Sequence, residues 1–573
     1  MSYDLKTPRV PRLVGRALRA ACETLESNRV GAALQRGLVW GVGLDTLGSS
    51  HVTGVPSLAP ELPVHEDAMA TEGTLTSRLP QLQALAETGT HKGPGGAPTI
   101  ADYARAYRDG SRTPLDVAER FLGFVEEDKR AKNGPLGAVF VSVDAEDLLA
   151  QAKASAARWA RGEPLSVLDG VPVPVKDEMD QLGHPTTAGS LVLDQHHRAT
   201  RDAVVVARLR QAGALLVGKT NMQELGAGAT GLNVPRGTPR NPWNPEHHTG
   251  GSSSGSATAV ALGLAPLAVG CDGGGSIRIP ASLCGLVGLK GRYGRMSSGG
   301  LVPLSPSLQH SGPITGTVAD CAVGYAVMAG RDPGDVFSLP QPPVDVGGLL
   351  DGLATASMTG VRLGIYRPWF DDADPGVRAT CHNVLDLLRQ AGAVLVDVTV
   401  PQLELARVAH LAIVASESRL FLEEYGAKRD QLSFDVRLGF AIGRAIEARH
   451  VQQAQRHRRA LGRAWHAMLH GIDALVTPTT PVTAPPIRPD ALLMGEADSA
   501  LLGALMRFTS HSNLIGVPGL SVPVGFSSGL PVGLQLLGKA WDEGRLLQIG
   551  AAVETVTAPQ RSRRPVNSLY LLS

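Results

Sequence analysis

The sequence is short of several features that mark particular protein classes. Lys and Arg total 54 and Asp and Glu total 53 among 573 residues, which gives a net charge of only +1. Such nearly equal numbers of basic and acidic residues argue against a broad basic face, so no nucleic-acid partner is expected. No run of about 18 uncharged apolar residues occurs, so no membrane-spanning helix is expected. Residues 1–12 are polar and lack a signal-peptide core, so we expect a cytoplasmic protein.

Cysteine is also scarce. The five cysteines are Cys22, Cys271, Cys284, Cys321 and Cys381, and no two of them have CxxC spacing. An odd number without paired spacing does not predict a disulfide framework and fits a reducing compartment. His247 and His248 are adjacent and lie beside a glycine-rich loop, and we interpret them as surface-loop residues, because a structural zinc site needs four convergent ligands. We therefore expect no metal and no other cofactor.

The residues that are present predict a large globular protein of the α/β class. Hydrophobic residues make up 43% and charged residues 19% of the chain. From Thr99 onward, helical stretches alternate with short apolar strands, as in Arg201–Ala212 followed by Ala214–Gly218. This alternation predicts a sheet between two helix layers. We divide the chain into an N-terminal helical extension with a connector, residues 1–95, and a catalytic domain, residues 96–573.

The N-terminal extension has a texture of its own. Residues 12–25 predict a helix with Leu13, Ala17 and Leu25 on its apolar face, and a second apolar stretch spans residues 30–47. Residues 48–98 are rich in Gly, Pro, Thr and Ser and predict an extended connector. Two interpretations are open for the helices. Packing on the main domain is favoured, and peripheral contact with a membrane surface is the alternative, because apolar and arginine-rich faces suit a lipid boundary.

The richest chemical signal lies between residues 249 and 291. It consists of two glycine–serine loops, Gly250-Gly-Ser-Ser-Ser-Gly-Ser and Asp272-Gly-Gly-Gly-Ser-Ile-Arg-Ile-Pro, on either side of one helix and one strand. The return of the chain brings both loops together, so serines from both can share a site. Amide hydrolysis needs a hydroxyl nucleophile with a base in reach and backbone N–H donors for the oxyanion. The backbone around Gly273, Gly274 and Gly275 can supply such donors.

Three other interpretations of these loops are weaker. A flexible linker has this composition, but the first loop lies between Trp243 and an apolar helix in the middle of a domain. A phosphate cradle would need the Gly-x-x-x-x-Gly-Lys pattern, which does not occur. Residues 251–255 formally match the Gly-x-Ser-x-Gly nucleophile elbow with Ser253 as nucleophile. That elbow follows a strand, and residues 244–249 do not read as one.

Taken together, these loops resemble the amidase signature family. The resemblance rests on both loops, on Cys284-Gly-Leu-Val-Gly-Leu-Lys and on Asp169-Gly-Val-Pro-Val-Pro-Val-Lys-Asp, and it extends from about residue 99 to about residue 556. It implies the amidase-signature fold, with a central mixed β-sheet between helix layers. It also implies a Ser–cis-Ser–Lys triad and an acyl-enzyme intermediate.

Carried over by motif, the resemblance assigns a role to each of several residues. Lys176 is the base, Ser252 the bridging serine after a cis Gly251–Ser252 peptide, and Ser276 the nucleophile. The oxyanion donors are the N–H groups around Gly273, Gly274 and Gly275. The implied supports and substrate-loop residues are Ser253, Ser254, Arg278, Gly226, Gly228 and Thr230. A lysine can accept a proton only when it is neutral, so burial of Lys176 is expected.

Within the family, the sequence is similar to the plant-type fatty acid amide hydrolases. They share the Gly-Gly-Gly-Ser nucleophile loop and an N-terminal extension. Position 271 is Cys where Thr is usual. The resemblance implies hydrolysis of small-molecule acyl amides such as N-acylethanolamines to acid and amine, and a homodimer. An acyl chain would need an apolar tunnel, for which the candidate wall residues are Leu34, Leu38, Phe434, Phe440 and Ile442. The alternatives are the amidase subunit of a tRNA-dependent amidotransferase and an amidase for short or aryl acyl amides.

Overall fold

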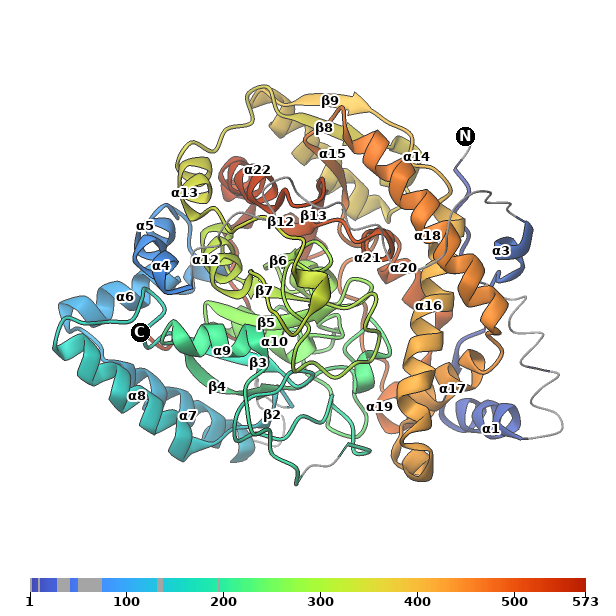
Figure 1. Cartoon of the computed structure of the whole chain (residues 1–573), viewed down its shortest axis with the longest axis horizontal. Helices are drawn as coiled ribbons and strands as arrows, with labels where there is room; N and C mark the ends of the chain where they lie inside the picture. The colour runs from blue at the N-terminus through green and yellow to red at the C-terminus, as the bar shows by residue number, and fades with distance from the viewer. Residues whose placement is uncertain are drawn as a thin grey trace.

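The centre of the molecule is an eleven-stranded mixed sheet. A computed structural model describes residues 3–8, 11–27, 34, 42–49, 75–130, 138–193 and 196–573. The strand order is β2-β4-β3-β5-β7-β6-β12-β13-β10-β8-β9 (Figure 1). The strands are β2 (Phe140–Ser142), β3 (Pro172–Lys176), β4 (Leu215–Thr220), β5 (Leu267–Asp272), β6 (Val287–Lys290), β7 (His310–Thr315), β8 (Arg362–Ile365), β9 (Val394–Asp397), β10 (Ala474–Pro478), β12 (Gly519–Ser527) and β13 (Leu530–Leu537). β3 is parallel to β4 and β5, whereas β5 is antiparallel to β7. The C-terminal ends of β3 and β5 therefore lie at the same edge.

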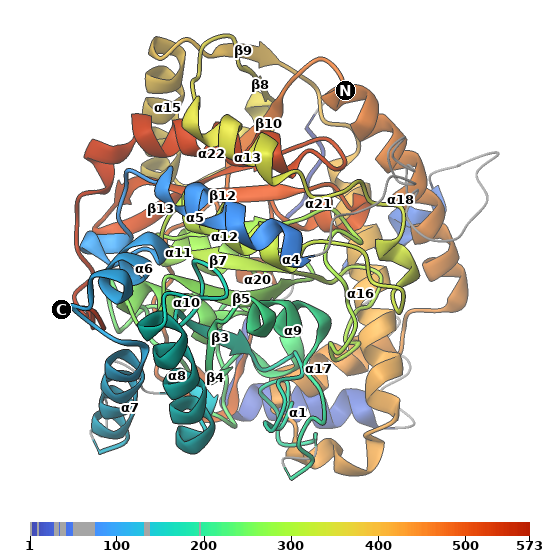
Figure 2. The same ribbon diagram turned by 60° about the vertical axis from the view of Figure 1, so that its left-hand side comes forward.

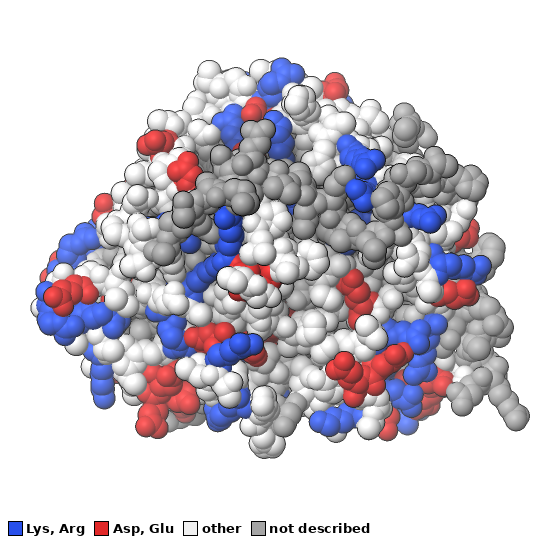
Figure 3. Space-filling model, in the orientation of Figure 1, with Lys and Arg blue, Asp and Glu red and all other residues white. Residues whose placement is uncertain are grey.

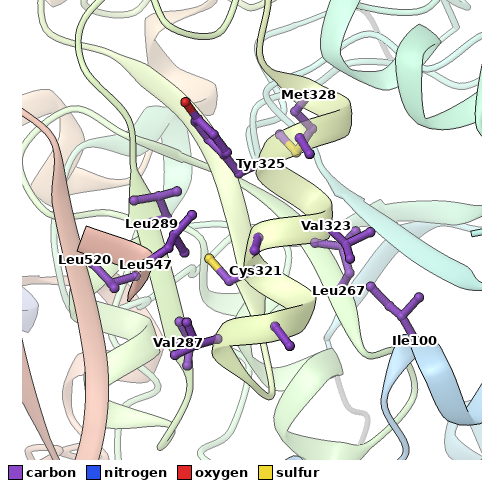
Figure 4. Packing of buried hydrophobic residues seen from close by; sticks show 14 of the residues in the cluster. Ile100, Leu267, Val287, Leu289, Cys321, Val323, Tyr325, Met328, Leu520 and Leu547 are labelled. Atoms are coloured by element: carbon purple, nitrogen blue, oxygen red, sulfur yellow. The ribbon is translucent and has the colours of Figure 1, made fainter. Parts of the chain in front are cut away.

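Alternate residues of the central strands face two different apolar cores. In β5, Leu267 and Val269 belong to the larger core, together with helices α12 (Val318–Met328) and α22 (Glu543–Val556). Figure 4 shows this packing around Cys321 and Val323 of α12. Ala268 faces the opposite way into a smaller core, with helices α10 (Ser254–Leu262) and α11 (Arg278–Leu283). Because strand side chains alternate between the two faces, the sheet lies between helices on both sides, as the sequence predicted.

The other helices surround this frame. α8 (Ala145–Ala160) contacts β4 and α7 (Pro114–Arg130), and its Trp159 lies beside Tyr107 of α6 (Ile100–Asp109). α9 (Val204–Gln211) contacts α12. Beyond α12 and α22 lie α5 (Leu82–Glu87) and α13 (Val346–Ala354). The rest are α14 (Arg367–Phe370), α15 (Pro375–Gln390), α16 (Leu403–Glu423), α17 (Phe434–Gly443), α18 (Ala448–Leu469), α19 (Ala491–Met494), α20 (Ser499–Leu505) and α21 (Ser510–Ile515). α16 packs on both α17 and α18 beside the sheet (Figure 2).

The N-terminal extension packs against this helical side. α1 (Gly15–Glu26) contacts α17, and α3 (Asp45–Ser49) contacts α16 and α18, so blue and orange elements lie side by side in Figures 1 and 2. β1 (Leu13–Val14) pairs antiparallel with β11 (Glu496–Ala497). In the described part of the extension the favoured interpretation, packing on the main body, therefore holds. Whether the extension also meets a membrane stays a prediction.

Two details of the predicted extension were wrong. α1 buries Leu18, Cys22 and Leu25, whereas Ala17 is exposed. These three side chains share one face at helical spacing and bury more apolar area than alanines do. The predicted extended connector is helical over α4 (Leu75–Arg78), η2 (Leu79–Gln81) and α5, because leucines there enter the main core. The proposed boundary near residue 95 thus follows residues that already pack on the body, and most of the rest of the connector lies outside the described residues.

The surface charge agrees with the nearly equal numbers of basic and acidic residues. Blue and red side chains are interspersed on the face shown in Figure 3. Among the described residues, no helix is both long and apolar enough to cross a membrane.

Asp320, in the first turn of α12, carries a prediction about stability. Its Oδ1 accepts a hydrogen bond from Ile100 N at 3.0 Å, and none of the described residues donates to Oδ2. Burial raises the pKa of this carboxyl from 3.8 to about 7. The native state therefore binds the proton more tightly than the unfolded state. Stability falls as the pH rises from the ordinary pKa of 3.8 to about 7.

Asp320→Asn removes this ionisation. Relative to the wild type, the variant should gain stability between pH 5 and pH 8, by about 1.4 kcal/mol for each unit of pKa shift that is titrated. Thermal unfolding midpoints of both proteins at the two pH values measure the change. An equal difference between variant and wild type at both pH values would contradict the prediction.

Candidate active site

Lys176 and the two glycine–serine loops meet at the edge where β3 and β5 end. Lys176 is the last residue of β3, and Ser276 lies in the turn between β5 and α11. Ser252 lies just before α10, and the Gly251–Ser252 peptide bond is cis, as the resemblance implied. Parallel strands present their carboxyl ends at one edge, which is where α/β proteins place their sites.

The side-chain nitrogen of Lys176 has three close neighbours. Its Nζ lies 2.9 Å from Ser252 Oγ and 3.0 Å from the backbone oxygen of Cys271. It also lies 2.8 Å from Oε2 of Glu178. Lys176 is fully buried and Glu178 nearly so. The arrangement can exchange a proton between lysine and serine in a site that excludes most water.

The loop that carries Ser276 is held by a buried ion pair. Arg278 Nε lies 3.0 Å from Asp272 Oδ2, and both side chains are completely buried. Arg278 also donates to Ser512, Gln535 and Asn513. Opposite charges and hydrogen bonds outweigh burial and hold the pKa of Asp272 well below its usual range. The predicted support, Arg278, thus fixes the loop that carries Ser276 through its ion pair with Asp272.

The glycines of the same loop differ in their partners. Gly273 and Gly274 line the cavity described below. Gly275 N–H, which the sequence grouped with the oxyanion donors, instead donates to Asp272 Oδ1 at 2.6 Å. The short side chain of Asp272 can reach forward to this amide, which is three residues further along the chain. Gly275 therefore supports the loop in this structure.

Side chains from outside the loop hold the two glycine carbonyls. His410 Nε2 donates to Gly273 O at 2.8 Å, and Thr509 Oγ1 donates to Gly274 O at 2.6 Å. Burial lowers the pKa of His410 to about 4, so the ring is neutral at physiological pH. The backbone of the loop is thereby fixed from α16 on one side and from the residue before α21 on the other.

The remaining predicted residues lie around this centre. Ser253 is buried, and its Oγ donates to Cys271 O at 3.2 Å, while Ser254 begins α10. Gly226 and Gly228 line the cavity. Thr230 is not among the lining residues, because its N–H and hydroxyl turn toward Gln223 Oε1.

A cavity of about 340 Å³ opens at the serines, a size typical of ligand sites. Its apolar walls come from Leu225, Leu304, Leu411, Val414, Val436, Phe440, Ile442, Leu502 and Met506. Leu5, Pro8 and Val42 of the N-terminal extension complete the wall. Asp435 also lines it, and burial raises the pKa of this carboxyl to about 6. The polar serine end and the apolar walls suit a ligand with one reactive polar group.

Of the predicted wall residues, Phe440 and Ile442 line the cavity and two others do not. Leu34 is 46% exposed, and Leu38 lies outside the described residues. Phe434, the first residue of α17, instead packs against α1, with Arg19 and Arg437 over its ring. Six residues of helix rotate the side chain by about 240°, so Phe434 and Phe440 cannot share a face.

Some functional groups were missed from the sequence. Glu178 could have been identified, because side chains two residues apart on an extended chain point to the same side, and Glu178 is two residues after Lys176. Asp272 could have been identified as the partner of Arg278. Asn513, Thr509 and His410 arrive from distant segments, and no local pattern marks them.

Metal ligands do not gather in the described part of the chain, where no group of three His, Cys, Asp or Glu side chains could hold an ion. The expectation that His247 and His248 are both surface-loop residues was wrong for His248, which is buried with its pKa lowered to about 4. His248 N–H donates to Pro485 O, so the backbone here is fastened to another segment.

Comparison with known proteins agrees with this geometry. Residues 129–547 match the Amidase family model. A fatty acid amide hydrolase of Arabidopsis thaliana is 37% identical, over 97% of this chain and 94% of the relative. A glutamyl-tRNA(Gln) amidotransferase subunit of Chloroflexus aggregans is 36% identical over 82% of this chain and 98% of the relative. A peptide amidase solved with the competitive inhibitor chymostatin is 30% identical, with a TM-score of 0.70, over 82% of this chain and 98% of that chain.

The fold, the loops and the family match together define an α/β amide hydrolase. The chain belongs to the amidase signature family. Among its relatives, the similarity to the Arabidopsis fatty acid amide hydrolase reaches into the N-terminal extension.

Proposed function

We propose that this chain is a serine amidase that hydrolyses acyl amides, of the N-acylethanolamine or fatty acid amide kind, through an acyl-enzyme on Ser276. The observation that carries the proposal is the 2.9 Å contact between Lys176 Nζ and Ser252 Oγ, at a cavity that Ser276 also lines. A nucleophile, a relay hydroxyl and a buried amine at one apolar cavity are the parts that acyl transfer requires.

In the proposed mechanism, neutral Lys176 acts as the base. Ser276 Oγ attacks the amide carbon and passes its proton to Ser252 Oγ, which passes its own proton to Lys176 Nζ. The carbonyl oxygen gains the negative charge, near the N–H groups around Gly273 and Gly274. The tetrahedral species then expels the amine, which takes the proton back along the same path. Water repeats the sequence on the acyl-enzyme and releases the acid.

The apolar walls support a long acyl chain as the part of the substrate that is recognised. Burial of each CH₂ contributes about 0.8 kcal/mol, so several such groups can supply most of the affinity. The similarity to the Arabidopsis enzyme also covers residues before the catalytic body, where Leu5, Pro8 and Val42 lie in the cavity wall. The participation of these N-terminal residues in the cavity wall supports a free-standing hydrolase over an amidotransferase subunit.

A hydrolysis panel with the purified full chain tests the proposed substrate class. N-acylethanolamines of increasing acyl length should give a kcat/KM that rises by as much as about fourfold per CH₂, until the cavity is filled. Short aryl amides should be poorer substrates, and glutamine alone should not be hydrolysed. A preference for short or aryl acyl groups would overturn the lipid assignment. Glutamine hydrolysis that requires added partner subunits would favour the amidotransferase alternative.

A further inference from the structure

Glu178 is a buried carboxylate at the relay to which neither the sequence motifs nor the proposed mechanism gives a role. It follows β3 by two residues and is 4% exposed, and its Oε2 contacts Lys176 Nζ at 2.8 Å. We propose that Glu178 is a positioning residue, which orients the lone pair of neutral Lys176 toward Ser252 and stabilises the ammonium that forms during attack. The inference rests on the proposed function, because it concerns the same proton relay.

The orientation follows from counting donors and acceptors around Nζ. A neutral amine has two N–H donors and one lone pair. The Cys271 carbonyl and an ionised Glu178 carboxylate can only accept hydrogen bonds, whereas the Ser252 hydroxyl can donate or accept. When both N–H groups bond to the two pure acceptors, the lone pair is left facing the Ser252 hydroxyl. That is the direction from which the relay proton arrives.

The Cys271 side chain leaves this pattern intact. Burial, followed by the neighbouring Glu178 charge, raises the pKa of the Cys271 thiol well above its usual range. The thiol therefore stays protonated and can donate to the carboxylate. A threonine hydroxyl, the usual group at this position according to the family resemblance, would offer the same donor.

The second part of the role concerns charge. When Lys176 has accepted the proton, its three N–H groups match the three neighbouring acceptors. The Glu178 charge then stabilises the new ammonium in a site from which water is largely excluded. The aspartate of a Ser–His–Asp triad stabilises its imidazolium in the same manner. The carboxylate interacts with the ammonium form and less with the neutral amine, so its removal should change the pH dependence of the reaction.

Three of the other titratable groups packed near the relay are compensated or neutral. Asp177, beside Lys176, pairs with Lys219 of β4 at 3.1 Å. Asp272, beside Cys271, pairs with Arg278. His410 of α16 is neutral, because burial lowers its pKa to about 4. Asp435 of α17 and His511 of α21 also line the cavity, where burial raises the pKa of the Asp435 carboxyl to about 6 and lowers the pKa of the His511 ring to about 4.

Glu178→Gln tests the inference, because it keeps the shape and removes the charge. The rate of labelling of Ser276 by a fluorophosphonate and kcat/KM for an acyl amide are measured from about pH 5 to about pH 10. We expect the acidic limb of both profiles to move to lower pH by about one unit or more. The rate on the alkaline plateau should fall about tenfold or more, because the ammonium loses its stabilising charge. A merely structural role would lower the rate without this displacement.

Two further variants make the result specific. Glu178→Asp keeps the charge and should leave the acidic limb near its wild-type position. Glu543→Gln removes a different buried carboxylate, at the start of α22 beside Arg295, and should not move the limb. If Glu178→Gln is less stable than the wild type, Glu543→Gln shows how much of the change comes from the loss of any buried charge and how much is local to Lys176.

The outcomes separate the inference from the proposed function. Failure of the wild type to be labelled would overturn the relay, and the role of Glu178 with it. Labelling of both proteins with acidic limbs at the same pH would overturn the role of Glu178 alone. Displacement of the limb by Glu543→Gln as well would also reject it.

Discussion

Ser276→Ala should reduce amide hydrolysis by about a millionfold and abolish labelling by a fluorophosphonate. The change removes the only atom that forms the acyl-enzyme in the proposed mechanism, while Lys176 and Ser252 keep their 2.9 Å contact. Ser276 lies at the cavity and is not fully buried, so the loss of one hydroxyl should leave the thermal midpoint nearly unchanged. Intact-mass spectrometry after labelling gives the stoichiometry for wild type and variant.

Ser282→Ala is the matched control for this prediction. Ser282 lies six residues further on, in α11, where its Oγ is 3.2 Å from Thr480 Oγ1 and away from the cavity. It should be labelled and should hydrolyse amides as the wild type does. A Ser276→Ala protein that is still labelled, or that retains a substantial fraction of the hydrolysis rate, would remove Ser276 from its role as nucleophile.

Arg278→Met should lower the free energy of unfolding by about 3–5 kcal/mol, the cost of leaving one member of a buried ion pair without its partner. The Asp272 carboxylate would remain with no opposing charge, and the hydrogen bonds of Arg278 to Ser512, Gln535 and Asn513 would be lost. Amide hydrolysis should fall as well, because Asp272 also holds the Gly275 amide. Chemical denaturation and activity of the same preparations measure both effects.

The pH dependence of this effect has a definite sign. Arg278 holds the pKa of Asp272 well below its usual range, so the pair contributes stability at neutral pH that is lost as the carboxyl is protonated in acid. The difference between Arg278→Met and wild type should therefore be greatest near neutrality. Arg278→Lys should rescue little, since one ammonium cannot reproduce the forked contacts. Asp272→Asn added to Arg278→Met should recover part of the lost stability. No recovery, or a single variant as stable as wild type, would refute the argument.

The sequence was informative where chemistry restricts the choice of residue. Lys176, Ser252 and Ser276 come from short motifs on three segments, and helices alternate with short apolar strands along this part of the chain. These parts could be located because a local pattern carries each of them. The structure brings them to one edge, and their catalytic roles stay predictions for the experiments above.

The sequence was less informative where position depends on packing between distant segments. Phe434 and Phe440 have similar apolar character, and only the rotation of α17 against α1 and α16 separates a buried contact from a cavity wall. Gly275 resembles its neighbours in sequence, yet one carboxylate engages its amide. Leucines in a Gly- and Pro-rich stretch look like a connector until the core that receives them is known.

The wall formed by Leu5, Pro8 and Val42 has a consequence for how such enzymes diversify. These residues precede the segment that matches the Amidase family, residues 129–547, whereas the relay lies within it. One part of the cavity wall is thus separate in sequence from the residues of the proposed relay, although the rest of the wall lies within the same segment as the relay. Mutations near the start of the chain can change which substrates enter without altering the proton path. Substrate range can therefore evolve, or be redesigned, at little risk to the reaction itself.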